Sequence, residues 1–156
     1  MNKFLKYFIL ILVIGYIILP SHVLSNNNLS SFQQPVEFRG IRWGADTINY
    51  PYLFLKSDNV GGIELFGREC ENLKLGSADL SEITYHFYND KFYQVSIGVR
   101  NDSDHQHLLD ELTEAFGTPY KETGFYIWEN GSFLISLYPE GARISYLPIL
   151  NKIKRD

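Results

Sequence analysis

The chain has 156 residues and carries 14 basic against 18 acidic side chains, which gives a net charge of −4. That balance argues against binding to nucleic acid or to anionic membrane surfaces, because both need a basic patch. The single cysteine, Cys70, excludes an intramolecular disulfide, so the hydrophobic core must stabilise the fold unaided. An aromatic content of 15% makes such a core feasible.

The first 25 residues have the pattern of a secretory signal peptide. Lys3 and Lys6 precede an apolar run from Tyr7 to Leu19, and Ser25 ends a sequence suited to cleavage. The run is shorter than the ~20 residues that a membrane-spanning helix needs. We therefore expect cleavage after Ser25, a periplasmic or secreted location, and no stable membrane span after cleavage. The alternative is an uncleaved N-terminal membrane anchor.

Composition divides the remainder of the chain into three parts. Residues 26–36 are polar and aperiodic, and we expect them to form a flexible leader. Residues 37–150 are expected to form a single domain, followed by a charged tail at residues 151–156.

The segment at residues 125–147 predicts three antiparallel strands joined by two tight turns. Asn130-Gly131 is the strongest hairpin signal, because both central residues of a type I′ turn need positive φ. A two-residue loop at that point sets Trp128 opposite Phe133.

Glu140-Gly141 predicts the second turn of this meander and sets Leu137 opposite Ile144. Side chains alternate between the two faces of a strand, so a slip of one residue would scramble the pattern. Both turns independently place the same apolar residues on one face: Tyr126, Trp128, Phe133, Ile135, Leu137, Ile144 and Tyr146. The other face is expected to carry Ser136, Tyr138, Arg143 and Ser145, together with Ile127 and Leu134.

Residues 81–100 predict a long hairpin in which Ile83 lies opposite Ile97. That pairing requires a loop of odd length, or a shorter turn combined with a β-bulge. One face of the hairpin is apolar, and the other is expected to be largely polar: Thr84, His86, Tyr88, Phe92, Gln94 and Ser96. Shorter strands are expected at residues 52–56 and 63–68.

A helix is expected to follow the hairpin and to cover the apolar side of the sheet. Ser103 is a suitable N-cap, and Gly117 with Pro119 is a helix stop signal. Between them apolar residues recur at helical spacing: Leu108, Leu109, Leu112, Ala115 and Phe116. The sequence therefore predicts an α+β fold, in which an antiparallel sheet (a hairpin plus a three-stranded meander) carries one principal helix on one face.

Three segments carry resemblances to known families. Residues 38–44 read FRGIRWG, the hairpin contains YHFYNDKFYQV, and the helix ends AFGTP before a strand that bears Trp128. Together they resemble a group of small secreted bacterial proteins of unknown function with an F-R-G-I-x-W-G opening. That resemblance covers residues 38–146 and implies a fold and a periplasmic location, but no activity. The helix and three strands at residues 108–146 are also distantly similar to the BamE/SmpA and beta-lactamase-inhibitor-like fold.

The polar face of the hairpin offers four candidate binding residues: His86, Tyr88, Phe92 and Gln94. Two aromatic side chains exposed on neighbouring strands would suit a protein partner or a ligand. The alternative is that another segment, such as the N-terminal half of the domain, covers them. Arg42 and Trp43 are further binding candidates, although Trp43 between two glycines also suits a core anchor.

Other polar clusters favour structural roles over catalysis. His105 and His107 point about 200° apart on a helix, so their segment suits helix capping better than a metal site. Cys70 lies between two glutamates, which oppose a reactive thiolate. With no cofactor motif in view, we expect a non-enzymatic periplasmic or secreted module that binds a protein partner. Two alternatives stay open: a small-molecule pocket between helix and sheet, and a hydrolase that uses Cys70.

Overall fold

The computed structural model describes residues 35–58 and 61–155. Residues Gln34–Asp156 form one compact unit with an α+β fold built mostly from antiparallel strands. The predicted signal peptide and nearly all of the predicted leader lie outside the described residues. Within the described part, no helix is both long enough and apolar enough to cross a membrane.

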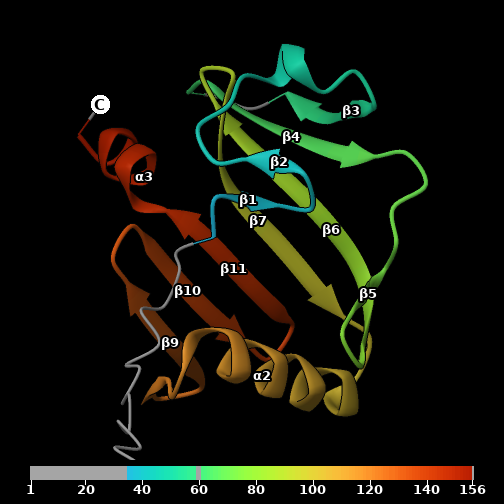
Figure 1. The fold of residues 1–156 in the computed structure, drawn as a ribbon, viewed down its shortest axis with the longest axis vertical. Helices are drawn as coiled ribbons and strands as arrows, with labels where there is room; N and C mark the ends of the chain where they lie inside the picture. The colour runs from blue at the N-terminus through green and yellow to red at the C-terminus, as the bar shows by residue number, and fades with distance from the viewer. Residues whose placement is uncertain (1–34, 59–60, 156) are drawn as a thin grey trace, which may run out of the picture. The chain divides into compact units, whose positions relative to one another are not determined.

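The path of the chain through its helices and strands can be followed in Figure 1. In chain order they are β1 (Glu37–Phe38), β2 (Ile41–Arg42), the 3-10 helix η1 (Thr47–Asn49), β3 (Leu53–Asp58), β4 (Ile63–Arg68), β5 (Lys74–Leu75), β6 (Ala78–Tyr88), β7 (Lys91–Val99), α2 (Asp102–Phe116), β8 (Tyr120–Glu122), β9 (Phe125–Asn130), β10 (Phe133–Tyr138), β11 (Gly141–Tyr146) and α3 (Leu147–Ile153). The helix α3 thus extends into the segment predicted to be a charged tail.

The strands form one large sheet and one small hairpin. The large sheet has nine strands in the order β3-β4-β6-β7-β11-β10-β9-β8, with β5 paired to β6. β1 and β2 pair with each other. The large sheet exceeds the sequence-based expectation, because β3, β4 and β8 join the β6–β7 hairpin and the β9–β11 strands.

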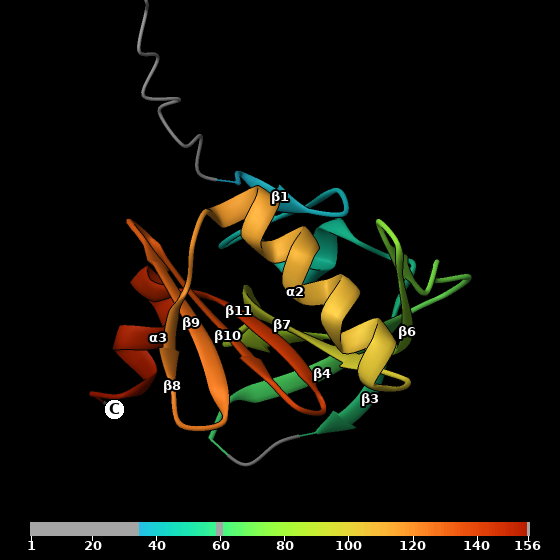
Figure 2. The ribbon, with the colours of Figure 1, turned by 90° about the horizontal axis from the view of Figure 1, so that it is seen from below.

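Both α2 and the β1–β2 hairpin lie on the same side of the large sheet (Figures 1 and 2). Leu108 and Leu112 of α2 and Ile41 of β2 are buried in one core with side chains of the sheet. We call this side the apolar face; its buried sheet residues include Ile83, Tyr85, Phe87, Phe92, Val95, Ile97, Trp128, Phe133, Ile135, Leu137 and Ile144. Burying a large aliphatic or aromatic side chain contributes ~1.5–3 kcal/mol, so this layer stabilises the fold.

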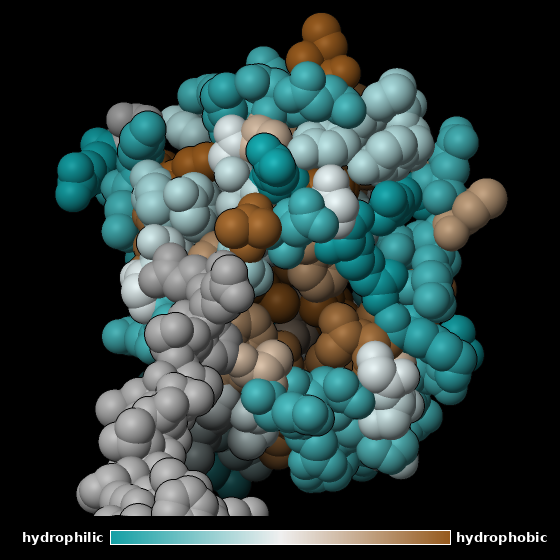
Figure 3. Space-filling view, viewed as in Figure 1, coloured by the Kyte–Doolittle hydropathy of each residue, from teal (hydrophilic) through white to brown (hydrophobic). Residues whose placement is uncertain are grey.

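The outer surface over the apolar face is not smooth. Figure 3 shows it hollowed between the N-terminal hairpin and α2, and the side chains visible inside the hollow are apolar. The surface around the hollow is mostly hydrophilic.

The helix α2 begins two residues earlier than the sequence suggested. Its N-cap is Asn101, whose side-chain Oδ1 accepts a hydrogen bond of 3.0 Å from the Asp104 backbone N–H. Ser103, the expected cap, lies inside the helix. The expected stop is confirmed: the helix ends at Phe116, and Gly117 has a φ of 80°.

The two meander turns each lie one residue away from their predicted positions. Trp128 pairs with Ile135 instead of Phe133, because the first loop is Gly131-Ser132. This places glycine at the first central position, where a type II′ turn requires positive φ, and Gly131 has a φ of 54°. Moving a turn by one residue changes each partner by two, and side chains alternate with a period of two. The predicted face therefore survives: Trp128 and Phe133 are both buried in the same core.

The second turn follows the same rule. Tyr138 pairs with Gly141, so the loop is Pro139-Glu140 and not Glu140-Gly141. Leu137 consequently lies opposite Ala142 instead of Ile144. The buried side of this pair of strands is again the predicted one.

The β6–β7 hairpin contains a β-bulge, the second of the two alternatives that its pairing allowed. Ile83 pairs with Ile97 as expected, but the hairpin closes with Tyr88 opposite Lys91 around a two-residue turn. The register shifts between His86 and Phe87, where Tyr93 is the extra residue on β7. Phe87 therefore lies opposite Phe92.

Candidate functional site

The bulge separates one predicted binding residue from the others. Phe92 is fully buried and its ring stacks on Trp43, with centroids 4.4 Å apart. The prediction that Phe92 lies on the polar face is therefore wrong, because the extra residue turns it to the apolar face. Tyr93 lies beside His86 instead, edge-on at 6.2 Å.

Trp43 belongs to the core side of the molecule, as the anchor interpretation requires. Besides stacking on Phe92, its ring contacts Phe133 at 5.2 Å and Tyr146 at 6.3 Å. Its indole Nε1 is buried and has no hydrogen-bond partner among the described residues. Arg42 is exposed on β2, in the hairpin over the apolar face. Neither residue shares a sheet face with His86.

His86, Tyr88 and Gln94 do lie together, on the side of the sheet opposite α2 and the β1–β2 hairpin. We call this side the polar face. Directly paired residues of antiparallel strands share a face, so the strand registers define two rows across it. The Arg143 row contains Tyr120, Ile127, Ser136, Arg143, Ser96 and Thr84. The His86 row contains Glu129, Leu134, Ser145, Gln94, His86 and Leu65.

A chain of hydrogen bonds fixes the centre of the polar face. Ser145 Oγ donates to Gln94 Oε1 at 3.0 Å, and Gln94 Nε2 lies 3.4 Å from His86 Nδ1. An amide nitrogen can only donate, so Nδ1 accepts and the neutral imidazole carries its proton on Nε2. That proton is donated to Ser96 Oγ at 2.9 Å. These hydrogen bonds therefore run in one donor-to-acceptor direction across three strands, β11, β7 and β6.

The surroundings keep His86 neutral. Burial lowers the pKa of its imidazole from 6.5 to about 4, and the positive charges of Arg143 and Lys56 act in the same direction. Protonation would also turn an N–H of the ring towards Gln94 Nε2, which is itself a donor. At neutral pH the residue is thus a fixed hydrogen-bonding element.

Ser96, the last residue of this series of hydrogen bonds, lies at a groove of about 430 Å³ on the polar face. Ser96, Tyr138 and Arg143 are among its lining residues. Arg143 is exposed, and its guanidinium lies 5.6 Å from the centre of the Tyr138 ring. Gly98 and Gly141, which pair with each other, also line the groove. Because they lack side chains, no side chain fills this end of it.

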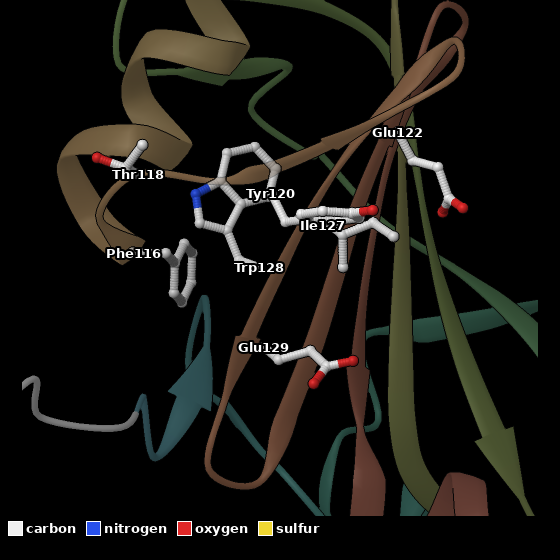
Figure 4. Close-up of a pocket in the computed structure, with 7 residues that line it drawn as sticks. All are labelled: Phe116, Thr118, Tyr120, Glu122, Ile127, Trp128 and Glu129. Carbon is white, nitrogen blue, oxygen red and sulfur yellow. The ribbon is translucent and has the colours of Figure 1, made fainter.

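A second and larger hollow, of about 580 Å³, lies at the far end of the same rows. Figure 4 shows the Tyr120 ring beside Ile127, with the carboxylates of Glu122 and Glu129 pointing away from α2. Tyr120 is 66% exposed, a high value for so large a side chain. Neither glutamate forms an ion pair among the described residues. An acidic, aromatic rim therefore borders the polar face.

The edge of the sheet holds this rim in place. β8 pairs with β9 only from Tyr120 to Glu122, so β9 runs on past it. Trp128 Nε1 donates a hydrogen bond of 2.7 Å to the Gly117 carbonyl, which ties the end of α2 to β9.

Cys70 lies elsewhere, in an exposed hollow that it shares with Arg39, Arg68, Glu71 and Asn72. No histidine lines that hollow among the described residues. Across residues 35–58 and 61–155, no group of three His, Cys, Asp or Glu side chains is arranged to hold a metal ion.

Sequence reasoning missed four residues that shape the polar face: Tyr93, Tyr120, Arg143 and Ser145. The bulge that places Tyr93 was foreseen as a possibility, but its position was not. The other three reach the face through the β7–β11 and β8–β9 pairings. Alternation around the meander did put Arg143 and Ser145 on its polar side, and only the long-range pairing brings them beside Gln94.

Comparisons with protein-family models, with curated proteins and with solved structures found no match to this chain. The fold and site define a small α+β protein with a covered apolar sheet face and an ordered polar one.

Proposed function

We propose that this is a non-enzymatic periplasmic or secreted module that binds a protein partner through its polar face. The observation that carries the proposal is that the side chains of the polar face are held in place although neither α2 nor the N-terminal hairpin packs on it. Its central side chains are held by the Ser145–Gln94–His86–Ser96 hydrogen bonds. A surface ordered before binding loses less side-chain entropy when a partner arrives.

The composition of the face supports a protein as the partner. Tyrosine and arginine are the residue types that most often dominate the energy of protein interfaces, and Tyr120 and Arg143 are the exposed members of one row. Ile127 and Ser136 separate them in that row. Three strand spacings of ~4.8 Å give ~14 Å between the two, well within the width of an ordinary interface.

The test is affinity capture from an extract of the exported proteins with matched baits. The baits are the unaltered protein, Tyr120→Ala and a control, Ile48→Ala. Ile48 is 88% exposed on η1, so its loss removes a comparable exposed apolar side chain outside the polar face.

A partner captured by the unaltered protein should be retained by Ile48→Ala. Its affinity for Tyr120→Ala should fall by ~30-fold or more, which corresponds to the ~2 kcal/mol lost when a tyrosine that dominates an interface is truncated. Equal retention by Tyr120→Ala and the unaltered protein would place the interface elsewhere and refute the proposal.

A small molecule bound between helix and sheet is a second candidate function. The apolar hollow between α2 and the N-terminal hairpin favours it (Figure 3). Saturable fluorescence enhancement of 1-anilinonaphthalene-8-sulfonate by the folded protein would support this candidate. A flat titration at neutral pH would count against it.

A further inference from the structure

We propose that the groove at Ser96 and Arg143 binds a carboxylate group presented by the protein partner, an inference that rests on the proposed function. Both residues line the groove, and they are direct cross-strand partners on β7 and β11.

Arg143 supplies the charge for this site. Its guanidinium is exposed, lies over the Tyr138 ring and takes part in no ion pair among the described residues. A guanidinium presents a planar set of donors that matches the two oxygens of a carboxylate. Its direct cross-strand partners, Ser96 and Ser136, are small, so no large side chain flanks Arg143 within its row.

Ser96 supplies a directed donor. Its oxygen already accepts the Nε2 proton of His86, which leaves its own hydroxyl proton available to a third group. Hydrogen bonds that follow one another polarise in the same sense, so the Ser145–Gln94–His86 sequence strengthens this terminal donor. The two donors that line the groove, Ser96 and Arg143, thus favour a single group that is rich in acceptors.

The surrounding charges limit that group to a small anion. Glu82 also lines the groove, but its carboxylate is paired with Lys56 at 3.1 Å. Glu140 is exposed at the rim and would repel an extended polyanion. The net charge of −4 acts in the same direction over longer distances. A single carboxylate on a partner that also contacts Tyr120 satisfies these conditions.

The experiment is an NMR titration of the purified, isotope-labelled protein with three probes at constant ionic strength. The probes are acetyl-Ala-Glu-Ala-amide, the matching glutamine peptide and inorganic phosphate. The glutamate peptide should cause saturable shifts of the Ser96 and Arg143 signals, and the glutamine peptide should not. Arg143→Gln should lower the affinity for the glutamate peptide by about tenfold or more. Arg155→Gln, an exposed arginine after α3, should leave the affinity unchanged.

Ser96→Ala should lower the affinity for the glutamate peptide by roughly threefold, the loss typical of one neutral hydrogen-bond donor. Equal shifts from the glutamate and glutamine peptides would overturn the inference, as would stronger binding of phosphate. If capture of a partner depends on Tyr120 while these titrations fail, the carboxylate site is wrong and the proposed function stands. If the peptide binds but no partner is captured, attribution of the carboxylate to a protein partner is refuted.

Discussion

Acidification should destabilise this protein through His86, between about pH 6.5 and pH 4. The pKa of the folded residue is about 4, against 6.5 in the unfolded chain. The unfolded state therefore binds more protons across this interval, and stability falls as the pH falls. At ~1.36 kcal/mol for each pKa unit, His86 alone should remove about 2.5 kcal/mol of stability between pH 7 and pH 4.5.

The measurement is the free energy of unfolding in urea, followed by tryptophan fluorescence at pH 7, 5.5 and 4.5. Carboxylates also titrate near the acid end, so the informative quantity is the difference between the unaltered protein and His86→Gln. At pH 7 the variant should be less stable, because it loses the bond to Ser96. By pH 4.5 that difference should have moved in favour of the variant by about 2.5 kcal/mol. His105→Gln, on α2, is the matched control and should follow the unaltered protein.

A second acid-sensitive group lies outside this window. The hydrogen bond and charge of Lys74 lower the pKa of Asp79 below 3.8, so its contribution is lost only at more acidic pH. Stability differences that stay constant from pH 7 to pH 4.5 would refute the account of His86. So would an imidazole that titrates near 6.5 by NMR.

Two backbone predictions and their controls can be checked by the same denaturation assay. Gly141→Ala should cost roughly 3 kcal/mol or more, because φ is 148° and a Cβ there would lie 1.9 Å from the Ile97 carbonyl oxygen. Gly124→Ala, with φ at 85° and no atom near the added Cβ, should cost only about 1 kcal/mol. Asn101→Ala should cost about 1 kcal/mol by removing the cap of α2, whereas Ser103→Ala should change stability by less than about 0.5 kcal/mol. Equal costs within either pair would contradict the corresponding geometry.

Local patterns in the sequence predicted which side of each strand is buried better than they predicted its partners. The two meander turns lie one residue from their expected sites, yet Trp128 and Phe133 share the core. An error of one residue in a turn preserves the parity of every side chain on the strand. At the bulge, the extra residue Tyr93 reverses that parity for Phe92. Bulge positions depend on packing and turn geometry together, which explains why Phe92 was placed on the wrong face.

Long-range pairing was beyond reach for a different reason. Nothing local to β7 or β11 specifies that Gln94 lies opposite Ser145. The pair depends on the whole path of the chain through α2 and the three intervening strands. The polar face was therefore foreseen only in fragments, one belonging to the β6–β7 hairpin and the other to the meander.

The order of the large sheet has a consequence for incomplete chains. Strand β11 is the last strand in the sequence, yet it lies between β7 and β10 in the middle of the sheet. A chain that stops before Gly141 would leave two open strand edges, which are prone to pair with other chains and aggregate. Synthesis of β11 thus marks the earliest moment at which the large sheet can close.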